Sequence, residues 1–157
     1  MAGDADVDAP WARVEPRQVH ELLSALPIRW WIAGGWALDV EGRLQHRDID
    51  VAVLRPEHEA LRDHLADWDL QIAHKGALHP WTGGPVGPPE NAVWARPRAH
   101  DPWHIDFKIE PVEGDQWLYR RDPAVRVPIA ELGILVDGVP FFAPTVARLY
   151  RDGSTKT

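Results

Sequence analysis

Hydrophobic and polar positions follow two periods along this chain, and these periods predict helices and strands in alternation. Apolar residues recur at helical spacing between Val19 and Leu26, where Pro27 closes the pattern. Pro56 suits the first turn of a second helix. The predicted helices cover about 16–26, 36–41, 56–69 and 144–150.

Shorter apolar or alternating runs predict strands between these helices. In the segment 103–109, His104, Asp106 and Lys108 alternate with apolar residues, so the three polar side chains share one face of the strand. These elements predict an α+β fold in which a mixed, mostly antiparallel sheet is flanked by helices. The other predicted strands are 28–33, 48–54, 70–73 and 92–96.

Turn-forming residues mark the connections between these elements. The dipeptide Asp137-Gly138 is typical of a tight hairpin, and the segment 75–91, dense in Pro and Gly, is expected to be a long irregular loop. No internal repeat or long linker divides the chain. We therefore predict one domain over residues 1–157, flexible in residues 1–10 and ending in a short tail at 151–157.

Composition narrows the classes of partner and location. The chain has 157 residues, no cysteine and a formal net charge of −7. The lack of cysteine excludes disulfides and thiolate-bound metals, and the negative charge argues against a long nucleic acid as partner. No apolar run approaches the roughly 20 residues of a membrane-spanning helix. The acidic N-terminus lacks the apolar core of a secretory signal, so no membrane partner and a cytoplasmic location are expected. Nine tryptophans are more than a chain of this length usually carries; most are expected in the core, and some are available to line a pocket for a bulky ligand.

The strongest chemical signal is the pair Asp48 and Asp50, which leads into an apolar run. Alternate residues of a strand share a face, so both carboxylates are expected to point the same way. At about 4 Å and an effective dielectric constant near 20, two unit charges repel by roughly 4 kcal/mol. Either one carboxylate takes up a proton or a divalent cation lies between them, and Mg²⁺ suits such oxygen ligands.

Two further features extend this signal to phosphate chemistry. Gly34-Gly35 ends the preceding apolar run and opens a predicted helix, where free backbone N–H groups favour a bound phosphate. Asp106 lies on the polar face of its strand, and a sheet that pairs this strand with 48–54 brings the three aspartates together. The combination suggests metal-assisted nucleotide chemistry.

The spacing of these residues resembles that of a known family. Gly34-Gly35, twelve intervening residues and the run DIDV at 48–51 resemble the signature of the polymerase-β-like nucleotidyltransferase superfamily. The longer runs GGWALD and HRDIDV resemble its lincosamide and aminoglycoside nucleotidyltransferases. The resemblance implies the nucleotidyltransferase fold and transfer of a nucleoside monophosphate from an NTP, expected to be ATP, to a hydroxyl of a small molecule such as one of these antibiotics. The short members of this group pair as dimers, so a homodimer is also implied.

The resemblance assigns the metal to the three aspartates. Asp48, Asp50 and Asp106 are implied to bind Mg²⁺ and to be catalytic, and Asp106 is also a candidate base for the attacking hydroxyl. The alternative for Asp106 is a surface ion pair with Lys108 or Arg96.

The nucleotide is implied to contact the residues around the two motifs. Gly34 and Gly35 would hold the triphosphate through backbone N–H groups, and His46 and Arg47 are candidate phosphate contacts. The alternatives are a purely structural hydrogen bond for His46 and a solvated loop position for Arg47.

Two neighbouring positions modify these expectations. Asp39, within GGWALD, is expected to support the short helix. Leu44 stands where the family usually has an arginine, two residues before the histidine.

Two alternatives to a small-molecule nucleotidyltransferase stay open: an enzyme that modifies protein or tRNA, as in toxin–antitoxin systems, or a non-catalytic domain that binds nucleotide.

Overall fold

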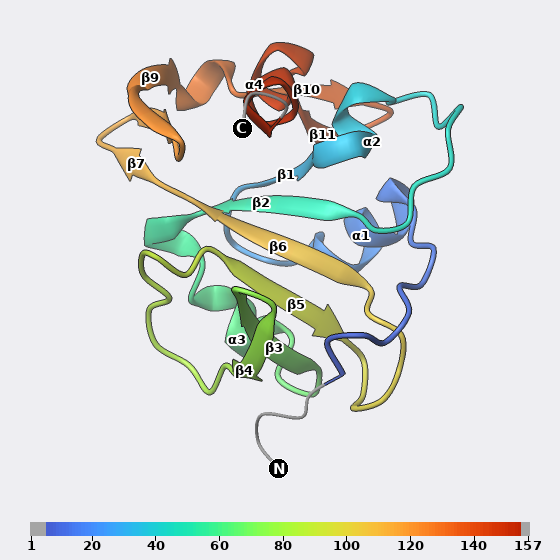
Figure 1. Cartoon of the computed structure of the whole chain (residues 1–157). Coiled ribbons are helices and arrows are strands. Elements are labelled where there is room, and N and C mark those ends of the chain that lie inside the picture. The colour runs from blue at the N-terminus through green and yellow to red at the C-terminus, as the bar shows by residue number, and fades with distance from the viewer. Residues whose placement is uncertain (1–5, 155–157) are drawn as a thin grey trace.

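Eight strands form a central sheet: β1 (Trp30–Ala33), β2 (Asp50–Leu54), β3 (Asp69–His74), β4 (Ala77–Pro80), β5 (Ala92–Arg96), β6 (Ile105–Glu110), β10 (Gly133–Val136) and β11 (Val139–Phe142). The computed structural model describes residues 6–154 and places these strands in the order β10-β11-β1-β2-β6-β5-β3-β4 (Figure 1). β11 pairs with β1 and β2 pairs with β6 in parallel, while the other neighbours are antiparallel. The predicted α+β fold with a mixed, mostly antiparallel sheet is confirmed.

Helices and a smaller antiparallel sheet complete the domain. The helices are α1 (Pro16–Leu23), α2 (Gly34–Leu38), α3 (Ala60–His64) and α4 (Pro144–Ser154), with 3-10 turns at η2 (Arg55–Glu57) and η3 (Ile129–Glu131). The smaller sheet has the order β7-β8-β9 and consists of β7 (Val112–Glu113), β8 (Gln116–Tyr119) and β9 (Asp122–Pro128). Within residues 6–154, no helix combines the length and the apolar character needed to cross a membrane.

Alternation along the strands divides the buried interior into two parts, because successive side chains of a strand point to opposite faces. Ile32 and Val51 belong to the larger core, which also contains apolar residues of α1 and α3. Ala33 and Ala52 belong to the second core, which contains apolar residues of α2, α4 and β8. Figure 1 shows α4 and β9 gathered on the side of β1 and β2 that lies away from β5. The second face of the sheet is therefore covered over β1 and β2.

The segment 75–91 contains a strand, β4, so the expectation of an irregular loop throughout is wrong over 77–80. Lys75 and Gly76 have positive φ angles of 51° and 77° and form the tight turn between β3 and β4. Leu78 is buried between exposed neighbours, so β4 has a single buried position and no visible alternating pattern.

The helix expected over 56–69 is also too long, because the chain forms only η2 and α3 there. The guanidinium of Arg62 donates hydrogen bonds to the carbonyls of Leu65, Ala66 and Trp68 at 3.4, 2.9 and 3.4 Å. A side chain thus satisfies carbonyls that a longer helix would pair with backbone N–H groups. This local side-chain contact takes the place of a continued helix.

The remaining expectations concern a turn and the two ends of the chain. Asp137 and Gly138, with φ angles of 51° and 81°, connect β10 and β11, so the predicted hairpin is confirmed. Residues 1–5 of the segment expected to be flexible, and residues 155–157 of the expected tail, lie outside the described residues.

Candidate active site

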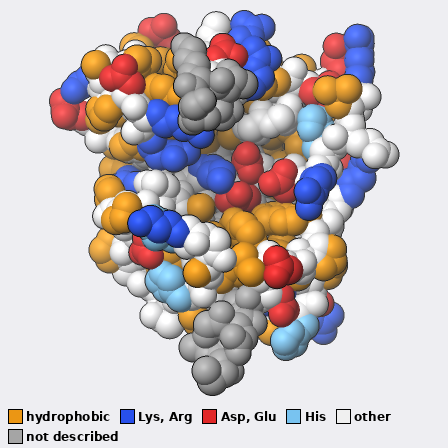
Figure 2. Space-filling model, in the orientation of Figure 1, with side chains coloured by type: hydrophobic (Ala, Val, Ile, Leu, Met, Phe, Trp, Pro, Cys, Tyr) orange, Lys and Arg blue, Asp and Glu red, His pale blue; other side chains and the backbone are white. Residues whose placement is uncertain are grey.

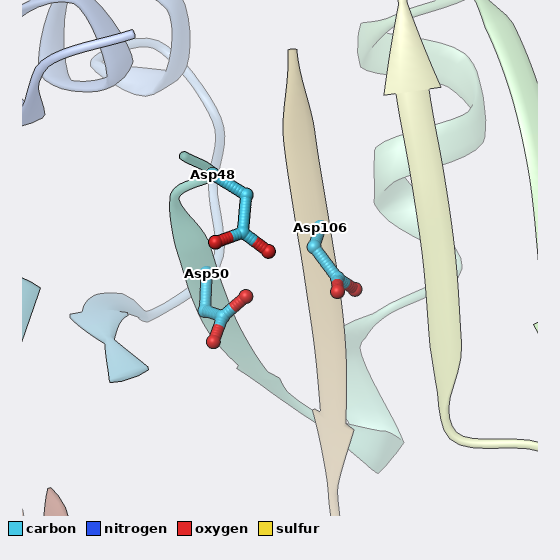
Figure 3. A group of neighbouring side chains, drawn as sticks. All are labelled: Asp48, Asp50 and Asp106. Carbon is cyan, nitrogen blue, oxygen red and sulfur yellow. The ribbon is translucent and has the colours of Figure 1, made fainter. Parts of the chain in front are cut away.

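Three carboxylates meet where β2 and β6 lie side by side. In the parallel register Asp50 lies opposite Asp106, and Asp48 precedes β2 by two residues. The Asp106 N–H donates to the Ile49 carbonyl at 3.0 Å, which extends the pairing toward Asp48. One ligand oxygen from each of the three aspartates lies within 4.8 Å of the others (Figure 3). The prediction that the two strands are neighbours is confirmed.

Asp106 is the most enclosed member of this group. The residue is 6% exposed, and its Oδ2 lies 3.0 Å from Nζ of Lys108. Its Oδ1 is buried, and no hydrogen-bond donor among residues 6–154 reaches it. Asp106 therefore has one oxygen held by an ammonium group and one free to take a proton or a cation.

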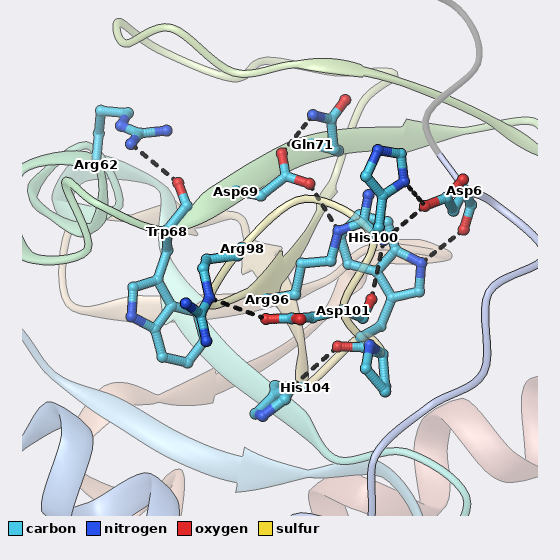
Figure 4. Close-up of polar contacts among 12 residues, drawn as sticks. Asp6, Arg62, Trp68, Asp69, Gln71, Arg96, Arg98, His100, Asp101 and His104 are labelled. Carbon is cyan, nitrogen blue, oxygen red and sulfur yellow. Dashed lines mark hydrogen bonds and ion pairs between the residues drawn. The ribbon is translucent and has the colours of Figure 1, made fainter.

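Arg96, the other candidate partner of Asp106, is engaged elsewhere. Its Nε donates to Oδ2 of Asp69 at 2.7 Å, and its Nη1 lies 3.1 Å from Oδ2 of Asp6 (Figure 4). The ion pair of Asp106 is thus with Lys108, and it is buried in the site and not on the surface.

The cluster carries more negative charge than its surroundings neutralise. Burial raises the pKa of Asp50, and repulsion from Asp106 raises it further, to about 7. Burial also raises the pKa of Asp106, although the Lys108 ammonium opposes this effect. Burial by itself would lower the pKa of Lys108, but the carboxylates of Asp106 and Asp50 outweigh it and raise that pKa. A proton or a metal ion has to make up the difference in charge.

The donor set fits a hard divalent cation. The ligand atoms are all carboxylate oxygens, as Mg²⁺ prefers, and Asp106 has in Oδ1 an oxygen without a partner among the described residues. Asp48 is exposed while Asp106 is buried, so the cluster is open to solvent on one side. Phosphate oxygens of a ligand have access to a cation from that side.

Gly34 lies directly against the Asp50 carboxylate. Its φ angle is 61°, and a Cβ built at this position would lie less than 3.0 Å from Oδ2 of Asp50 and 3.0 Å from its Cγ. At Gly35 a Cβ would lie 3.0 Å from Nδ1 of His46. The two glycines form the first turn of α2, which was expected to begin two residues later, at Trp36. Glycine at 34 lets the chain pass beside the carboxylates, and the phosphate contact of both residues stays a prediction.

Asp39 holds the loop between α2 and the aspartates. Its Oδ1 accepts a hydrogen bond from the Arg43 N–H at 3.1 Å and its Oδ2 accepts one from the Leu44 N–H at 2.8 Å. Oδ2 also lies 2.9 Å from Nε2 of His46. The bond from Leu44 lowers the pKa of Asp39 most, followed by that from His46. The Asp39 side chain therefore organises the loop, while its backbone N–H donates to the Trp36 carbonyl at 3.1 Å at the C-terminal end of α2.

His46 and its neighbours have different surroundings within this loop. The His46 ring is hydrogen-bonded to Asp39, and its centroid lies 4.7 Å from that of the Trp36 ring, an arrangement that matches the structural alternative for this histidine. Arg47 is exposed, and so is Leu44, with 64% of its surface accessible. The loop thus presents an apolar side chain where the resembled family has an arginine.

A cavity of about 200 Å³ adjoins Asp50. Its walls include Gly34 and the cationic side chains of Lys108, Arg120 and Arg121. The sequence did not single out the two arginines, which lie in the turn between β8 and β9. No local pattern could have found them, because the fold alone carries this turn to Asp50.

Buried Glu110 fixes the position of Arg120. Glu110 is 1% exposed, and its Oε1 accepts hydrogen bonds from Nε1 of Trp117 at 3.0 Å and from the hydroxyl of Tyr150 at 2.6 Å. Its Oε2 accepts one from Nε of Arg120 at 3.2 Å. Glu110 extends the row of alternate polar residues that contains Asp106 and Lys108, so the sequence pattern could have identified it.

Acidic and basic side chains lie next to each other on one face of the molecule. Figure 2 shows acidic side chains at the centre of this face, with Lys and Arg side chains beside them and a hydrophobic area below. The acidic centre adjoins the cavity lined by Lys108, Arg120 and Arg121. An anionic ligand bridged by a metal ion has both kinds of partner here.

Comparisons with known proteins give a family match and similar folds. Residues 16–76 match the family model of aminoglycoside-2''-adenylyltransferase. No curated protein matches the sequence. A Thermotoga maritima structure described as a nucleotidyltransferase has a TM-score of 0.54 and 11% sequence identity, with 89% of this chain and 82% of that chain covered. The structure of ANT(2'')-Ia in complex with adenylyl-2''-tobramycin has a TM-score of 0.49 and 18% identity, with 90% and 77% covered.

The family match and the similar fold both indicate a nucleotidyltransferase. Residues 16–76 include Gly34, Gly35, Asp48 and Asp50, and the Thermotoga structure shares the overall fold. Together these findings support a nucleotidyltransferase. The chain has the nucleotidyltransferase fold and resembles the nucleotidyltransferase superfamily, as its motifs predict.

Proposed function

We propose that this protein transfers a nucleoside monophosphate from an NTP, with ATP the expected donor, to a hydroxyl group of a small molecule. The observation that carries the proposal is the cluster of Asp48, Asp50 and Asp106, which lies beside a cavity lined by cationic side chains. Phosphoryl transfer depends on positioning and on charge neutralisation, and these two features supply both. Aminoglycosides and lincosamides are the acceptor classes that the resemblance implies, and a homodimer remains part of the proposal.

All three aspartates would bind the metal ion, and Asp106 is in addition the candidate base. Asp48, Asp50 and Asp106 would hold Mg²⁺, which when bound neutralises phosphate charge and polarises the reacting phosphate. Lys108 holds Oδ2 of Asp106, so the unpartnered Oδ1 would serve either as a ligand of the cation or as the acceptor of the hydroxyl proton. The acceptor oxygen forms its bond to the α-phosphorus as the bond to the β-phosphate oxygen breaks, and pyrophosphate leaves.

Arg120 and Arg121 are the proposed contacts of the leaving phosphates. Both line the cavity beside Asp50 and Gly34. The Nε of Arg120 donates to Glu110, which fixes this arginine, and the Nη1 of Arg121 donates to the Tyr150 carbonyl at 2.8 Å. These arginines would supply the positive charge that the loop lacks at Leu44. His46 and Arg47 remain candidate phosphate contacts.

ATP is expected to bind at least tenfold more tightly with Mg²⁺ than with EDTA, a difference of about 1.4 kcal/mol. The cation relieves repulsion among the carboxylates and at the same time bridges the triphosphate. Calorimetric titration of the full chain measures both affinities. The control is Asp67→Asn, an exposed aspartate outside the cluster, which should keep the difference. Equal affinity in Mg²⁺ and EDTA would show that the aspartates do not form a metal site.

Arg121→Gln is expected to weaken the binding of inorganic pyrophosphate in the presence of Mg²⁺ about tenfold. A charge-assisted contact to phosphate is worth about 1.5 kcal/mol or more. Arg126→Gln is the matched control, because Arg126 lies on β9, pairs with Glu113 on the surface and is absent from the cavity walls. An Arg121→Gln protein that binds pyrophosphate as the control does would remove this residue from the phosphate site.

A further inference from the structure

A second cavity, of about 220 Å³, lies against Asp106 and shares Lys108 with the cavity beside Asp50. β6 pairs with β2 along one edge and with β5 along the other. Asp106 is therefore paired in register with Asp50 on the β2 side and with Trp94 on the β5 side. Asp106 itself lines this second cavity. Since the cationic cavity lies on the Asp50 side, the β5 side is where a hydroxyl can approach Asp106.

The walls of the second cavity suit a flat apolar ring. Trp94, Val7 and Leu78 line it, together with small alanine side chains. The half-buried Trp94 is held by edge-on contacts, with its ring centroid 5.0 Å from that of Trp11 and 5.5 Å from that of Trp103. A fixed, partly exposed indole offers a surface on which a sugar or aryl ring stacks at small entropic cost.

The charges around the second cavity do not suit a polycation. Among the described residues that line it, Asp106 is the single acid, and Lys108 already pairs with it. Lys75 and His74, in and before the β3–β4 turn, add basic groups. A ligand with several ammonium groups would meet like charges here, and like charges in a partly desolvated site cost several kcal/mol. Cavities for drug-sized ligands measure about 300–1,000 Å³, so this smaller one holds a single ring.

We propose that the second cavity binds the acceptor, and that the acceptor is a neutral or anionic alcohol whose ring stacks on Trp94, not a polycationic aminoglycoside. The assignment rests on the proposed function, because it takes Asp106 as the residue that receives the hydroxyl proton. The ring lies over Trp94 with its hydroxyl toward the Asp106 side chain, and Lys75 lies at the rim formed by the turn.

The test follows the indole N–H signals of the ¹⁵N-labelled full chain by NMR, with the Trp94 signal assigned by its loss in Trp94→Ala. The neutral 4-nitrophenyl glucoside should shift the Trp94 signal in a saturable manner, while tobramycin at the same concentration should not. Trp94→Ala should lower the affinity for the glucoside at least tenfold. Trp68→Ala, which removes a half-buried indole outside the cavity, should leave it unchanged.

Charge reversal in the exposed turn provides a second, independent variant. Lys75→Glu should raise the affinity for tobramycin about tenfold and leave that for the glucoside within twofold. Tighter binding of tobramycin than of the glucoside at Trp94, or no shift of the Trp94 signal with either compound, would overturn the proposal.

Mg²⁺-ATP titrations on the same samples separate the acceptor proposal from the proposed nucleotidyl transfer. Unchanged ATP binding would leave the nucleotide site standing, whereas an unmodified protein that binds no Mg²⁺-ATP would reject the proposed function itself.

Discussion

Asp50→Asn should remove nucleotidyl transfer while the protein keeps or gains stability. The substitution preserves the shape of the side chain but removes one negative charge from the three-carboxylate cluster. Loss of a metal-binding carboxylate should lower the rate at least a hundredfold, which corresponds to about 2.7 kcal/mol of transition-state stabilisation. Stability should not fall, because repulsion between Asp50 and Asp106 disappears as well.

The gain in stability should depend on pH in a defined direction. The pKa of Asp50 is raised from 3.8 to about 7, so the folded protein holds this proton more tightly than the unfolded chain does. The resulting stabilisation is fully present below about pH 4 and is lost as the pH rises through 7. The advantage of Asp50→Asn in metal-free protein should therefore grow from about pH 4 upward and be largest above pH 7. Its upper limit is about 4 kcal/mol, at 1.36 kcal/mol for each pKa unit.

Two measurements check this expectation. Melting temperatures in EDTA between pH 5 and 8.5 report stability, and mass spectrometry of hydroxyl acceptors incubated with Mg²⁺ and NTP reports the nucleotidyl adduct. Asp67→Asn serves as the exposed control and should match the unmodified protein in both. A variant that melts much earlier yet still transfers normally would rule out the metal role of Asp50.

Gly34→Ala should destabilise the protein by about 2–5 kcal/mol, the second large effect. Two costs combine at this position. The left-handed backbone, with φ at 61°, costs an alanine about 1–2 kcal/mol. The added Cβ would also press on the Asp50 carboxylate at less than 3.0 Å, and forcing atoms into a packed site costs about 1–3 kcal/mol. Denaturant unfolding at pH 7.5 measures the sum.

Gly76→Ala separates the two costs of Gly34→Ala. Gly76 has a similar φ angle of 77°, but a Cβ there would meet no atom of residues 6–154 within 4 Å. Its substitution should cost only the backbone term, about 1–2 kcal/mol. Combining Gly34→Ala with Asp50→Ala should recover most of the steric part, because the carboxylate is gone and only the Cβ of residue 50, at 3.2 Å, still meets the new Cβ. Equal losses for Gly34→Ala and Gly76→Ala would mean that Asp50 does not pack against Gly34 as described.

The sequence by itself determined the parts of this protein that depend on neighbouring residues. Period-two alternation over 103–109 located the strand that became β6, and the Asp137-Gly138 turn located a hairpin. The aspartates at 48 and 50 could be recognised because their spacing predicts two carboxylates on one side of the chain that repel each other, although β2 itself begins only at Asp50. Asp106 could be joined to them because its strand showed one polar and one apolar face.

Tertiary structure decided whatever depends on residues far apart in the chain. Arg120 and Arg121 reach the site only because β8 and β9 fold back beside Glu110 and α4, and no local period records that contact. Trp94 became the neighbour of Asp106 through strand pairing, which the sequence pattern leaves open. Local propensity acts over a few residues, whereas the burial of apolar faces and the satisfaction of buried charges are settled across the whole fold.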